Sequence, residues 1–368
     1  MKILLLAGEE SGLIYANRLR ELLADCEIRS YADYGFQTSD LAVMGFAAVL
    51  RRIGFFLEVK KTMEKAIDEW RPDVVCTIDY PGMNLKLSAY AKSRGIRTLH
   101  IVCPQVWAWR AGRIPKIEAS TDALCCFLPF EPALFRPGFA TYVGHPLAEY
   151  FKGCANGTER GRAAGGKDIL AILPGSRIGE IENNLPTLLD AAELLGPGVE
   201  VAVPAANPGA EAAIDAIISA RGAGRGGLKI TRHPVGSARK LLLSATCAAV
   251  ASGTATLEAA LARCPTVLVY RVSAALAWFA RRAIKGVGHI GLANIVWEKS
   301  GGGGEAPMPE LLQEDFTAEN VAAALRKWLD DPAARRAAAE RLDRTVARLK
   351  TDGSAFAKMA AMIKGENT

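Results

Sequence analysis

Long apolar runs are missing from this chain of 368 residues. Its hydrophobic runs fall far short of the ~20 residues that a helix needs to span a bilayer. The first of them, Lys2–Leu6, leads at once into a loop of Gly and Glu, so we expect a buried strand there and no secretion signal. These absences predict a cytoplasmic protein whose thiols stay reduced.

Metal-ligand spacings and basic segments are missing as well. The eight cysteines include no CxxC pair and no Cys/His cluster, so we expect no metal site. The formal net charge of +6 is not gathered into a basic stripe interleaved with aromatic residues, which argues against a nucleic-acid partner. A mild positive charge suits anionic partners such as nucleotides, phosphorylated substrates or an anionic membrane surface.

Short apolar runs alternate with segments of helical period along the chain. The expected strands are Lys2–Leu6, Asp73–Ile78, Arg97–Val102, Ala123–Leu128, Thr141–Val143, Asp168–Leu173, Glu200–Val203, Cys247–Ala251 and Thr266–Tyr270. The expected helices are Leu57–Trp70, Asn84–Arg94, Asn183–Leu195, Gly209–Arg221, Ala255–Arg263 and Thr317–Trp328. This alternation predicts an α/β protein with parallel sheets built from right-handed βαβ units.

The alternation is interrupted at residues 152–167, a stretch rich in Gly, charge and small side chains. Such a composition predicts an exposed linker. We therefore expect a first domain over residues 1–151, a second over 168–345, and a terminal helix over 346–368 that packs back toward the first domain. Two doubly wound, Rossmann-like domains of this kind would place a ligand cleft between the carboxyl edges of their strands.

Two loops of the first domain carry carboxylates. The loop Gly8–Gly12 has glycines that permit a tight turn around Glu9 and Ser11. It is not a GxGxxG loop, and its carboxylates would repel a pyrophosphate; an ordinary capped turn is the alternative. Asp79 ends an apolar strand, where it could act as a general base or orient a sugar. Capping of the next helix by Asp79 or Asn84 is the alternative there.

Aromatic and cationic side chains follow in two further segments. In Pro104–Arg110, Trp107 and a second Trp stand beside Arg110, which suits contact with a sugar or a phosphate; packing of each Trp between helices is the alternative. The stretch Val49–Leu57 and the two lysines after it mix apolar and cationic side chains. That mixture suits a membrane surface or a lipid substrate, or else ordinary core packing.

Two loops of the second domain have the composition of phosphate sites. Pro174–Arg177 includes Ser176 and opens a helix, whose free N–H groups attract anions, and Arg177 adds a bidentate phosphate donor. In Ser252–Glu258, small hydroxyl residues and Gly follow an apolar strand and could hold a diphosphate. Glu258 could accept both ribose hydroxyls. A plain turn and a Ser/Thr-capped helix are the respective alternatives.

In this order the loops resemble lipid-A-disaccharide synthase, a family of GT-B glycosyltransferases. The resemblance covers nearly the whole chain. It rests on AGEESG (Ala7–Gly12), MGF (Met44–Phe46), IDYPGMN (Ile78–Asn84), PQVWAWR (Pro104–Arg110), LPFE (Leu128–Glu131), VGHPL (Val143–Leu147), LPGSRIGEI (Leu173–Ile181) and SGTATLE (Ser252–Glu258).

The resemblance implies an inverting sugar transfer without a cofactor or an essential metal. UDP-2,3-diacylglucosamine would donate its sugar to 2,3-diacylglucosamine 1-phosphate, giving the β-1,6-linked lipid A disaccharide 1-phosphate and UDP. The implied partners are these lipid-linked sugars, the inner membrane surface as a peripheral contact, and a second copy of the chain in a homodimer.

The same resemblance implies roles for single residues. Asp79 matches the proposed catalytic carboxylate, and Glu9 is the second catalytic candidate. The residues implied on the UDP-sugar side are Arg177, Ser176, Ser252, Gly253, Thr254, Glu258, Asn294 and Gln313, and those on the acceptor side are Ser11, Asn84, Trp107 and Arg110. Without a metal, Arg177 and the helix N-termini would neutralise the leaving diphosphate.

Two positions depart from the family pattern, because Leu13 and Gly82 each stand where the family has an Asp. Both changes remove an anion from the acceptor side and so bear on acceptor positioning more than on UDP binding. Two other functions stay open. One is a UDP-sugar epimerase or hydrolase on the same fold, and the other is a UDP-sugar-binding protein without catalysis.

Overall fold

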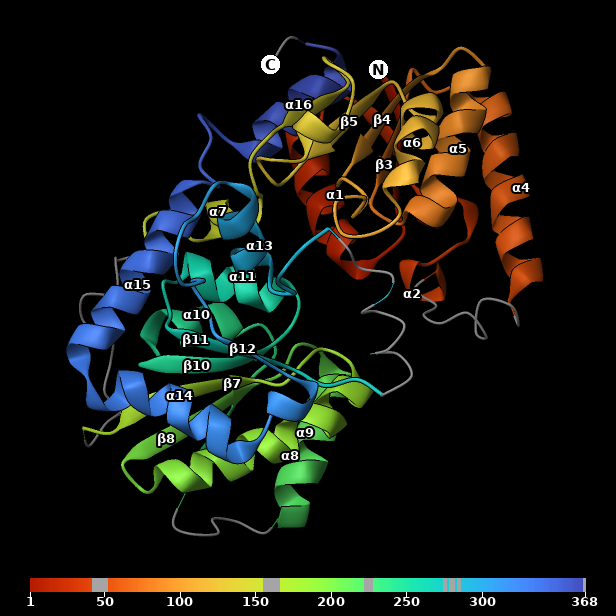
Figure 1. The fold of residues 1–368 in the computed structure, drawn as a ribbon. Coiled ribbons are helices and arrows are strands. Elements are labelled where there is room, and N and C mark those ends of the chain that lie inside the picture. Colours follow the sequence, from red (N-terminus) through yellow and green to blue (C-terminus); the bar gives the residue numbers. More distant parts are fainter. Residues whose placement is uncertain are drawn as a thin grey trace. The chain divides into compact units, whose positions relative to one another are not determined.

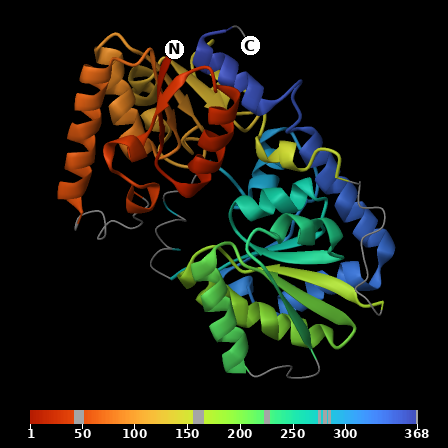
Figure 2. The ribbon, with the colours of Figure 1, turned by 180° about the vertical axis from the view of Figure 1, so that it is seen from behind.

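The computed structural model describes residues 1–41, 52–154, 166–221, 228–273, 277, 282 and 286–366. The chain divides into two compact units: unit 1 is Met1–Glu149 with Leu349–Thr368, and unit 2 is Tyr150–Arg348 (Figures 1 and 2). Most of the expected linker over 152–167, at residues 155–165, lies outside the described residues, as does the MGF segment at residues 44–46.

Unit 1 is built on a six-stranded parallel sheet with the strand order β2-β1-β3-β4-β5-β6. The strands are β1 (Lys2–Ala7), β2 (Glu27–Arg29), β3 (Val74–Ile78), β4 (Arg97–Ile101), β5 (Ala123–Cys126) and β6 (Ala140–Tyr142). The order reverses between β1 and β3, because the chain runs outward to β2 and then crosses back. Doubly wound sheets bind ligands at the carboxyl ends of the strands beside such a reversal. Glu9 follows β1 and Asp79 follows β3, so both predicted carboxylates lie at this point.

Helices cover both faces of this sheet, which explains its continuous apolar strands. They are α1 (Glu10–Leu22), α2 (Thr38–Leu41), α4 (Ile53–Trp70), α5 (Pro81–Ser93), α6 (Ile114–Ser120) and α16 (Ala355–Lys364), with single 3₁₀ turns at Tyr31–Tyr34, Ala111–Arg113 and Pro132–Leu134. A short helix, α7 (Leu147–Tyr150), spans the point where the chain passes from unit 1 to unit 2. Along β1, Ile3 and Leu5 pack with α1 and α16, whereas Leu4 and Leu6 pack with α4 and α5. This alternation is the period of two expected of a strand.

Unit 2 contains a second six-stranded parallel sheet, with the order β12-β11-β10-β7-β8-β9. Its strands are β7 (Asp168–Leu173), β8 (Val199–Pro204), β9 (Lys229–His233), β10 (Cys247–Ala251), β11 (Thr266–Tyr270) and β12 (Glu310–Leu312). Here the order reverses between β7 and β10. The two loops predicted to bind phosphate, Pro174–Arg177 and Ser252–Glu258, follow these two strands.

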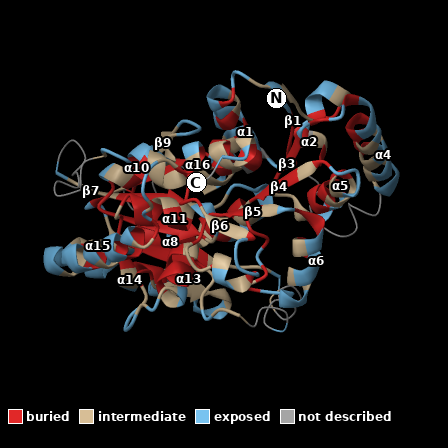
Figure 3. Cartoon of the chain, turned by 90° about the horizontal axis from the view of Figure 1, so that it is seen from above, coloured by how far each residue is buried: buried red, intermediate tan, exposed pale blue. Residues whose placement is uncertain are grey.

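The helices of unit 2 also form two layers around their sheet. They are α8 (Ile178–Leu195), α9 (Pro208–Arg221), α10 (Ala238–Ser244), α11 (Thr254–Leu261), α13 (Leu292–Lys299), α14 (Ala318–Asp330) and α15 (Pro332–Ala347), with a 3₁₀ turn at Gln313–Asp315. Helices α8, α9 and α14 pack on one face, and α11 packs with α13 and α15. Buried residues gather on the strands and on the helix sides that face them (Figure 3). Among the helices described, none has the length and apolar character to cross a bilayer.

The predicted α/β class with two doubly wound parallel sheets is confirmed. Three expected strands, β7, β10 and β11, have the predicted bounds, and each expected helix corresponds to one in the structure. The sequence did not predict the short strands β2, β9 and β12. Each has polar or half-buried residues in place of an apolar run, because each lies at or beside an edge of its sheet.

Candidate active site

Asp79 lies on a strained turn at the carboxyl end of β3. Asp79 and Tyr80 both have left-handed backbone, with φ of 50° and 52°, a conformation that non-glycine residues rarely adopt. The Asp79 N–H donates to the Ile101 carbonyl at 2.9 Å, and the Tyr80 N–H donates to Asp79 Oδ1 at 2.8 Å. Burial raises the pKa of the half-buried Asp79 carboxyl, and the Tyr80 N–H opposes this rise. A carboxylate of raised pKa on a strained turn suits a general base.

Asn84 holds this turn in place. Its buried Nδ2 donates to three main-chain carbonyls, those of Leu6 at 3.2 Å, Ile78 at 3.1 Å and Asp79 at 2.8 Å. Its Oδ1 accepts from the Tyr31 hydroxyl at 2.7 Å. Because the amide is engaged within the protein, it does not face an acceptor sugar. The structure therefore places Asn84, expected on the acceptor side, beneath Asp79 as a positioning residue.

Tyr80 joins the Asp79 turn to the loop after β1. A Cβ at residue 8 would lie 2.5 Å from the Tyr80 ring, so only glycine fits beside it. This close approach makes the Glu9 loop and the Asp79 turn neighbours. The exposed Glu9 precedes α1. Burial first, and then the charge of Glu9, raises the pKa of the Tyr80 hydroxyl. The side chain of Ser11 lies outside the part of the chain that the structure describes.

The departures from the family pattern lie on the helices that open from these two loops. Leu13 lies on α1 and is 37% exposed. Gly82 lies in the first turn of α5, and a Cβ there would meet nothing within 4 Å. A larger side chain would therefore fit at position 82, so its lack of a carboxylate is not imposed by packing in unit 1.

Trp107 is held by a buried carboxylate. Its indole Nε1 donates to Glu131 Oε1 at 3.0 Å, and its ring packs edge-on against Phe130 at 5.8 Å between centroids. The other carboxylate oxygen, Oε2, accepts from the N–H groups of Phe127 at 3.1 Å and Leu128 at 3.0 Å. Burial raises the pKa of Glu131 to about 7, although these three donors oppose the rise. Trp107 thus ties the loop after β4 to the LPFE segment.

Trp109 and Arg110 are the exposed part of the same loop. The Arg110 guanidinium carbon lies 4.4 Å from the Trp109 ring centroid, a cation–π stack. Arg110 has a φ of 58°, and Val102, where the loop leaves β4, has a φ of 78°. A β-branched residue at positive φ marks a backbone that its surroundings hold in place. The stacked cation is suited to an anionic group.

Among the described residues, one group could be considered for a metal: Cys103, Cys126 and Glu131, which are all buried. The Glu131 carboxylate already accepts three hydrogen bonds. Hydrogen bonding by Cys126 and burial raise the pKa of the Cys103 thiol, whereas a metal ligand must be a thiolate. The chemistry of this donor set therefore fits a packed core better than a metal centre.

In unit 2, Ser176 and Arg177 lie exposed in the loop after β7, with Arg177 capping α8. Two asparagines fix the main chain of this loop. Asn184 Nδ2 donates to the Pro174 carbonyl at 3.0 Å, and Asn207 Nδ2 donates to the Ser176 carbonyl at 3.0 Å. These two bonds fix the main chain that carries the Ser176 N–H group and the Arg177 guanidinium.

The loop after β10 has the form predicted for a diphosphate site. Gly253 caps α11 with a φ of 145°, and Thr254 is exposed beside it. The Thr256 hydroxyl donates to the Gly253 carbonyl at 2.8 Å. Glu258 is half-buried one turn further on; burial raises the pKa of its carboxyl and Arg239 opposes this rise.

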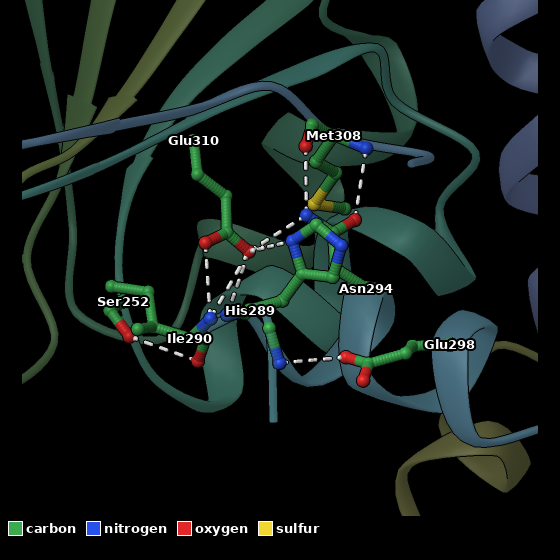
Figure 4. Close-up of polar contacts among 9 residues, drawn as sticks. Ser252, His289, Ile290, Asn294, Glu298, Met308 and Glu310 are labelled. Carbon is green, nitrogen blue, oxygen red and sulfur yellow. Dashed lines mark hydrogen bonds and ion pairs between the residues drawn. The ribbon is translucent and has the colours of Figure 1, made fainter. Parts of the chain in front are cut away.

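Ser252 and Asn294 are brought together around a residue that the sequence did not single out, Glu310 (Figure 4). The Glu310 carboxylate accepts from the N–H groups of Ile290 at 3.0 Å and Gly291 at 3.1 Å, and from Asn294 Nδ2 at 2.8 Å. Ser252 Oγ donates to the Ile290 carbonyl at 3.5 Å. Glu310 thus fixes the segment that leads into α13 next to the loop after β10.

Asn294 itself is fully buried. Besides its bond to Glu310, its Nδ2 donates to the Met308 carbonyl at 2.8 Å, and its Oδ1 accepts from the Met308 N–H at 3.0 Å. The amide is therefore occupied by the protein, and the structure places Asn294 as a positioning residue and not at a surface open to a nucleotide. Glu310 gave no signal in the sequence, because it begins a three-residue strand without an apolar pattern.

Gln313 follows β12 at the same carboxyl edge of the sheet, with a φ of 51°. Its Oε1 accepts from the Val272 N–H at 3.4 Å. The amide nitrogen is a donor beyond the end of β12, at the edge that also carries the loops after β7 and β10. Gln313 is therefore compatible with the nucleotide side to which the resemblance assigns it.

Comparison with known proteins identifies the family. The family model for lipid-A-disaccharide synthetase matches residues 3–363. The chain belongs to this family. A lipid-A-disaccharide synthase of Chromohalobacter salexigens is 36% identical over 359 residues, which cover 92% of this chain and 90% of that protein. Another, from Geobacter metallireducens, is 33% identical and covers 90% of this chain and 88% of its own length.

Solved structures with a similar fold include glycosyltransferases and epimerases. A putative UDP-N-acetylglucosamine 2-epimerase of Listeria monocytogenes superposes with a TM-score of 0.59 at 14% identity, covering 99% of this chain and 96% of the other. The calicheamicin glycosyltransferase CalG4 has a TM-score of 0.58 at 15% identity, with coverage of 99% and 97%. These likenesses confirm the predicted GT-B fold, and the family match identifies a hexosyltransferase of lipid A disaccharide synthesis.

Proposed function

We propose that this enzyme joins UDP-2,3-diacylglucosamine to 2,3-diacylglucosamine 1-phosphate, with inversion, to give the β-1,6-linked disaccharide 1-phosphate and UDP. Asp79 removes the proton from the acceptor 6-hydroxyl. The hydroxyl oxygen forms a bond to the anomeric carbon of the donor sugar as the bond from that carbon to the UDP oxygen breaks, and UDP leaves with the electron pair. Family membership supports the reaction class, and the acceptor and donor follow from the resemblance.

The single observation that carries this proposal is the Asp79 turn. A strained, half-buried carboxylate at the strand-order reversal of unit 1, held by the buried Asn84, has the geometry of a pre-organised base. The raised pKa of Asp79 makes its carboxylate a stronger base than an exposed one. Glu9, in the neighbouring loop, is proposed to assist in orienting the acceptor, with Trp107 and Arg110 on the same side.

Unit 2 is proposed to bind UDP without a cofactor or a metal. Ser176, Arg177 and the loop Ser252–Thr254 supply N–H groups, hydroxyls and one guanidinium for the diphosphate, and Glu258 accepts the ribose hydroxyls. Such fixed donors stabilise the charge that develops on the leaving group. In this proposal Asn294 acts through Glu310 by positioning the chain around Ser252.

We also propose that the protein is cytoplasmic and contacts the inner membrane peripherally. Ile53 and Leu57, one turn apart on α4, are 55% and 61% exposed, and Lys60 and Lys61 follow them. Exposed apolar side chains next to cations suit a surface of anionic lipid. Residues 49–51 of this predicted lipid-facing stretch lie outside the described residues. A homodimer is part of the same proposal and rests on the resemblance.

The test measures UDP release with and without the diacylated sugar 1-phosphate, for the wild type and Asp79→Asn. Asn tolerates left-handed backbone and still accepts from the Tyr80 N–H, so the turn should persist. We expect acceptor-dependent release that falls about a hundredfold or more in the variant, the scale of lost general-base catalysis. Equal thermal stability of the two proteins is the control for folding.

Three other outcomes would contradict the proposal. Release without acceptor would indicate a hydrolase or an epimerase. Tight UDP binding without turnover would indicate a binding protein, for which Leu13 and Gly82 are the candidate causes. Full activity of Asp79→Asn would exclude Asp79 as the base.

A further inference from the structure

A carboxylate of the protein lies on the donors that are proposed to bind the diphosphate. Glu180, in the first turn of α8, accepts from the Ser176 N–H through Oε2 at 3.2 Å and from Arg177 Nη1 through Oε1 at 2.7 Å. One carboxylate thereby engages both a main-chain donor and the guanidinium of the phosphate loop. These are the two kinds of donor that a phosphate group uses at a helix N-terminus.

The space that the Glu180 side chain fills exists because residue 175 is glycine. A Cβ at Gly175 would lie 2.6 Å from Glu180 Cβ and 2.8 Å from its Oε2, at a φ of 133° that disfavours other residues in any case. Tyr270, at the end of β11, is within electrostatic range of this pair. Burial and the Glu180 charge raise the pKa of the Tyr270 hydroxyl, while Arg177 lowers it.

The main chain of the phosphate loop and the side chain of Glu180 are held in different ways. The Ser176 main chain is fixed by Asn207, and the loop as a whole by Asn184. By contrast, the Glu180 side chain is only 17% exposed but is linked to the helix by flexible single bonds, and Arg177 is 58% exposed. The Ser176 N–H is therefore fixed through its main chain, whereas the Glu180 carboxylate is held at the end of a side chain.

We propose that Glu180 is an internal counter-anion of the phosphate loop, which the diphosphate of the donor must displace from Ser176 and Arg177. This inference rests on the proposed function and deepens it by naming a residue that sets affinity for UDP. Displacement opposes binding, because two hydrogen bonds within the protein are exchanged for two to the ligand. The returning carboxylate then favours release of UDP after the transfer, and in the free enzyme it keeps the loop in one conformation.

The experiment compares Glu180→Gln with Glu182→Gln by calorimetric titration of UDP and of inorganic pyrophosphate. Glu182 lies on the same helix, is exposed, and loses the same charge. We expect Glu180→Gln to bind both ligands about three- to tenfold more tightly, the scale of one partly exposed ion pair and one hydrogen bond. Glu182→Gln should bind as the wild type does.

A second variant, Glu180→Asp, keeps the charge, but its side chain is too short to reach the Ser176 N–H. It should give an intermediate gain in affinity for both ligands.

Unchanged or weaker binding by a folded Glu180→Gln would overturn the inference, because the carboxylate would then support the ligand instead of competing with it. An equal gain in Glu182→Gln would also overturn it, since general electrostatics would account for the effect. If neither the wild type nor the variants bind UDP, the inference and the proposed function both fail. Tighter binding in Glu180→Gln together with no acceptor-dependent turnover would sustain the inference and refute the proposed function alone.

Discussion

At the scale of single residues, position 310 requires a carboxylate. The isosteric amide of glutamine does not satisfy the groups around it. Every hydrogen-bonding partner recorded around it is a donor: the N–H groups of Ile290 and Gly291 and the amide nitrogen of Asn294. His289 Nδ1 lies 3.5 Å from Oε1. An ionised carboxylate accepts from all of these, whereas the NH₂ of a glutamine must face at least one of them.

We therefore predict that Glu310→Gln destabilises unit 2 by about 2–3 kcal/mol, the effect of leaving a buried donor unpaired. It should also weaken UDP binding, since the segment next to Ser252 would move. The control is Glu298→Gln. Glu298 accepts from the Gly288 N–H at 3.0 Å with a side chain that is 35% exposed, so a glutamine can turn its oxygen to this donor at a cost of less than about 1 kcal/mol. Denaturant unfolding of both variants checks the prediction, and equal losses would contradict it.

Sequence patterns identified the residues that end apolar strands more readily than those that support them. Asp79 and Arg177 were predicted because each follows a clear buried strand. Asn84 and Asn294 were also predicted, but as ligand contacts. Their burial depends on partners far along the chain, Tyr31 and Met308, and no local pattern records such pairing. Glu310 was missed for the same reason, since its donors belong to another segment.

At the scale of elements, the strongest predictions came from the central strands, whose two buried faces leave an unbroken apolar run. Edge strands such as β2 and β12 have half-buried, mixed sequences and gave no signal. The sequence also predicted which loops carry the chemistry. It did not predict how they are held. The loop after β4 depends on Glu131, whose family segment carried the resemblance but no assigned role.

Glu131 gives unit 1 a predicted dependence on pH. Burial raises its pKa from 4.5 to about 7 in the folded protein. Between these values the folded state holds a proton on Glu131 that the unfolded chain has released, so the contribution of Glu131 to the free energy of unfolding falls as pH rises, by up to about 1.4 kcal/mol per pH unit. Burial lowers the pKa of His100 to about 3 and that of His145 to about 4, so these two groups contribute a rise over part of the same interval. Hydrogen bonding by Cys126 and burial raise the pKa of the adjacent Cys103 thiol, and burial raises that of the nearby Tyr142 hydroxyl, so neither titrates in this interval.

In Glu131→Gln this contribution should disappear, so the slope of the free energy of unfolding against pH should be more positive than in the wild type, by up to about 1.4 kcal/mol per pH unit, whatever the stability of the variant at one pH. The measurement is denaturant unfolding of unit 1 at several pH values between about 4.5 and about 7. Glu58→Gln, which removes an exposed carboxylate from α4, should keep the slope of the wild type. A Glu131→Gln protein with the slope of the wild type would show that Glu131 is ionised throughout, held by its three N–H donors.

At the scale of the whole molecule, the chain forms two units, each with its own sheet and its own core. The sequence predicted the two βα series. The last helix, α16, belongs to unit 1 although unit 2 lies between them in the sequence. Its first turn is capped by Glu149, which accepts from the Ser354 hydroxyl at 2.8 Å and from the Phe356 N–H at 3.4 Å. The core of unit 1 is therefore complete only when the C-terminus is in place.

This arrangement predicts that core substitutions act within one unit. Phe356 is 2% exposed among the side chains of β1 and α1, with its ring 6.2 Å from that of Tyr15. Phe316, fully buried, is its counterpart in the core of unit 2.

Each change to alanine should destabilise its own unit by about 3–5 kcal/mol, through lost burial and the cavity left behind. In calorimetric unfolding we expect two transitions. UDP should raise the midpoint temperature of the unit 2 transition only, because a ligand stabilises the state that binds it. Phe356→Ala should lower the midpoint temperature of the transition that UDP leaves unchanged, and Phe316→Ala should lower that of the transition that UDP shifts. If both variants lower a single shared transition, the two cores unfold as one cooperative structure, and the C-terminal helix stabilises the whole chain.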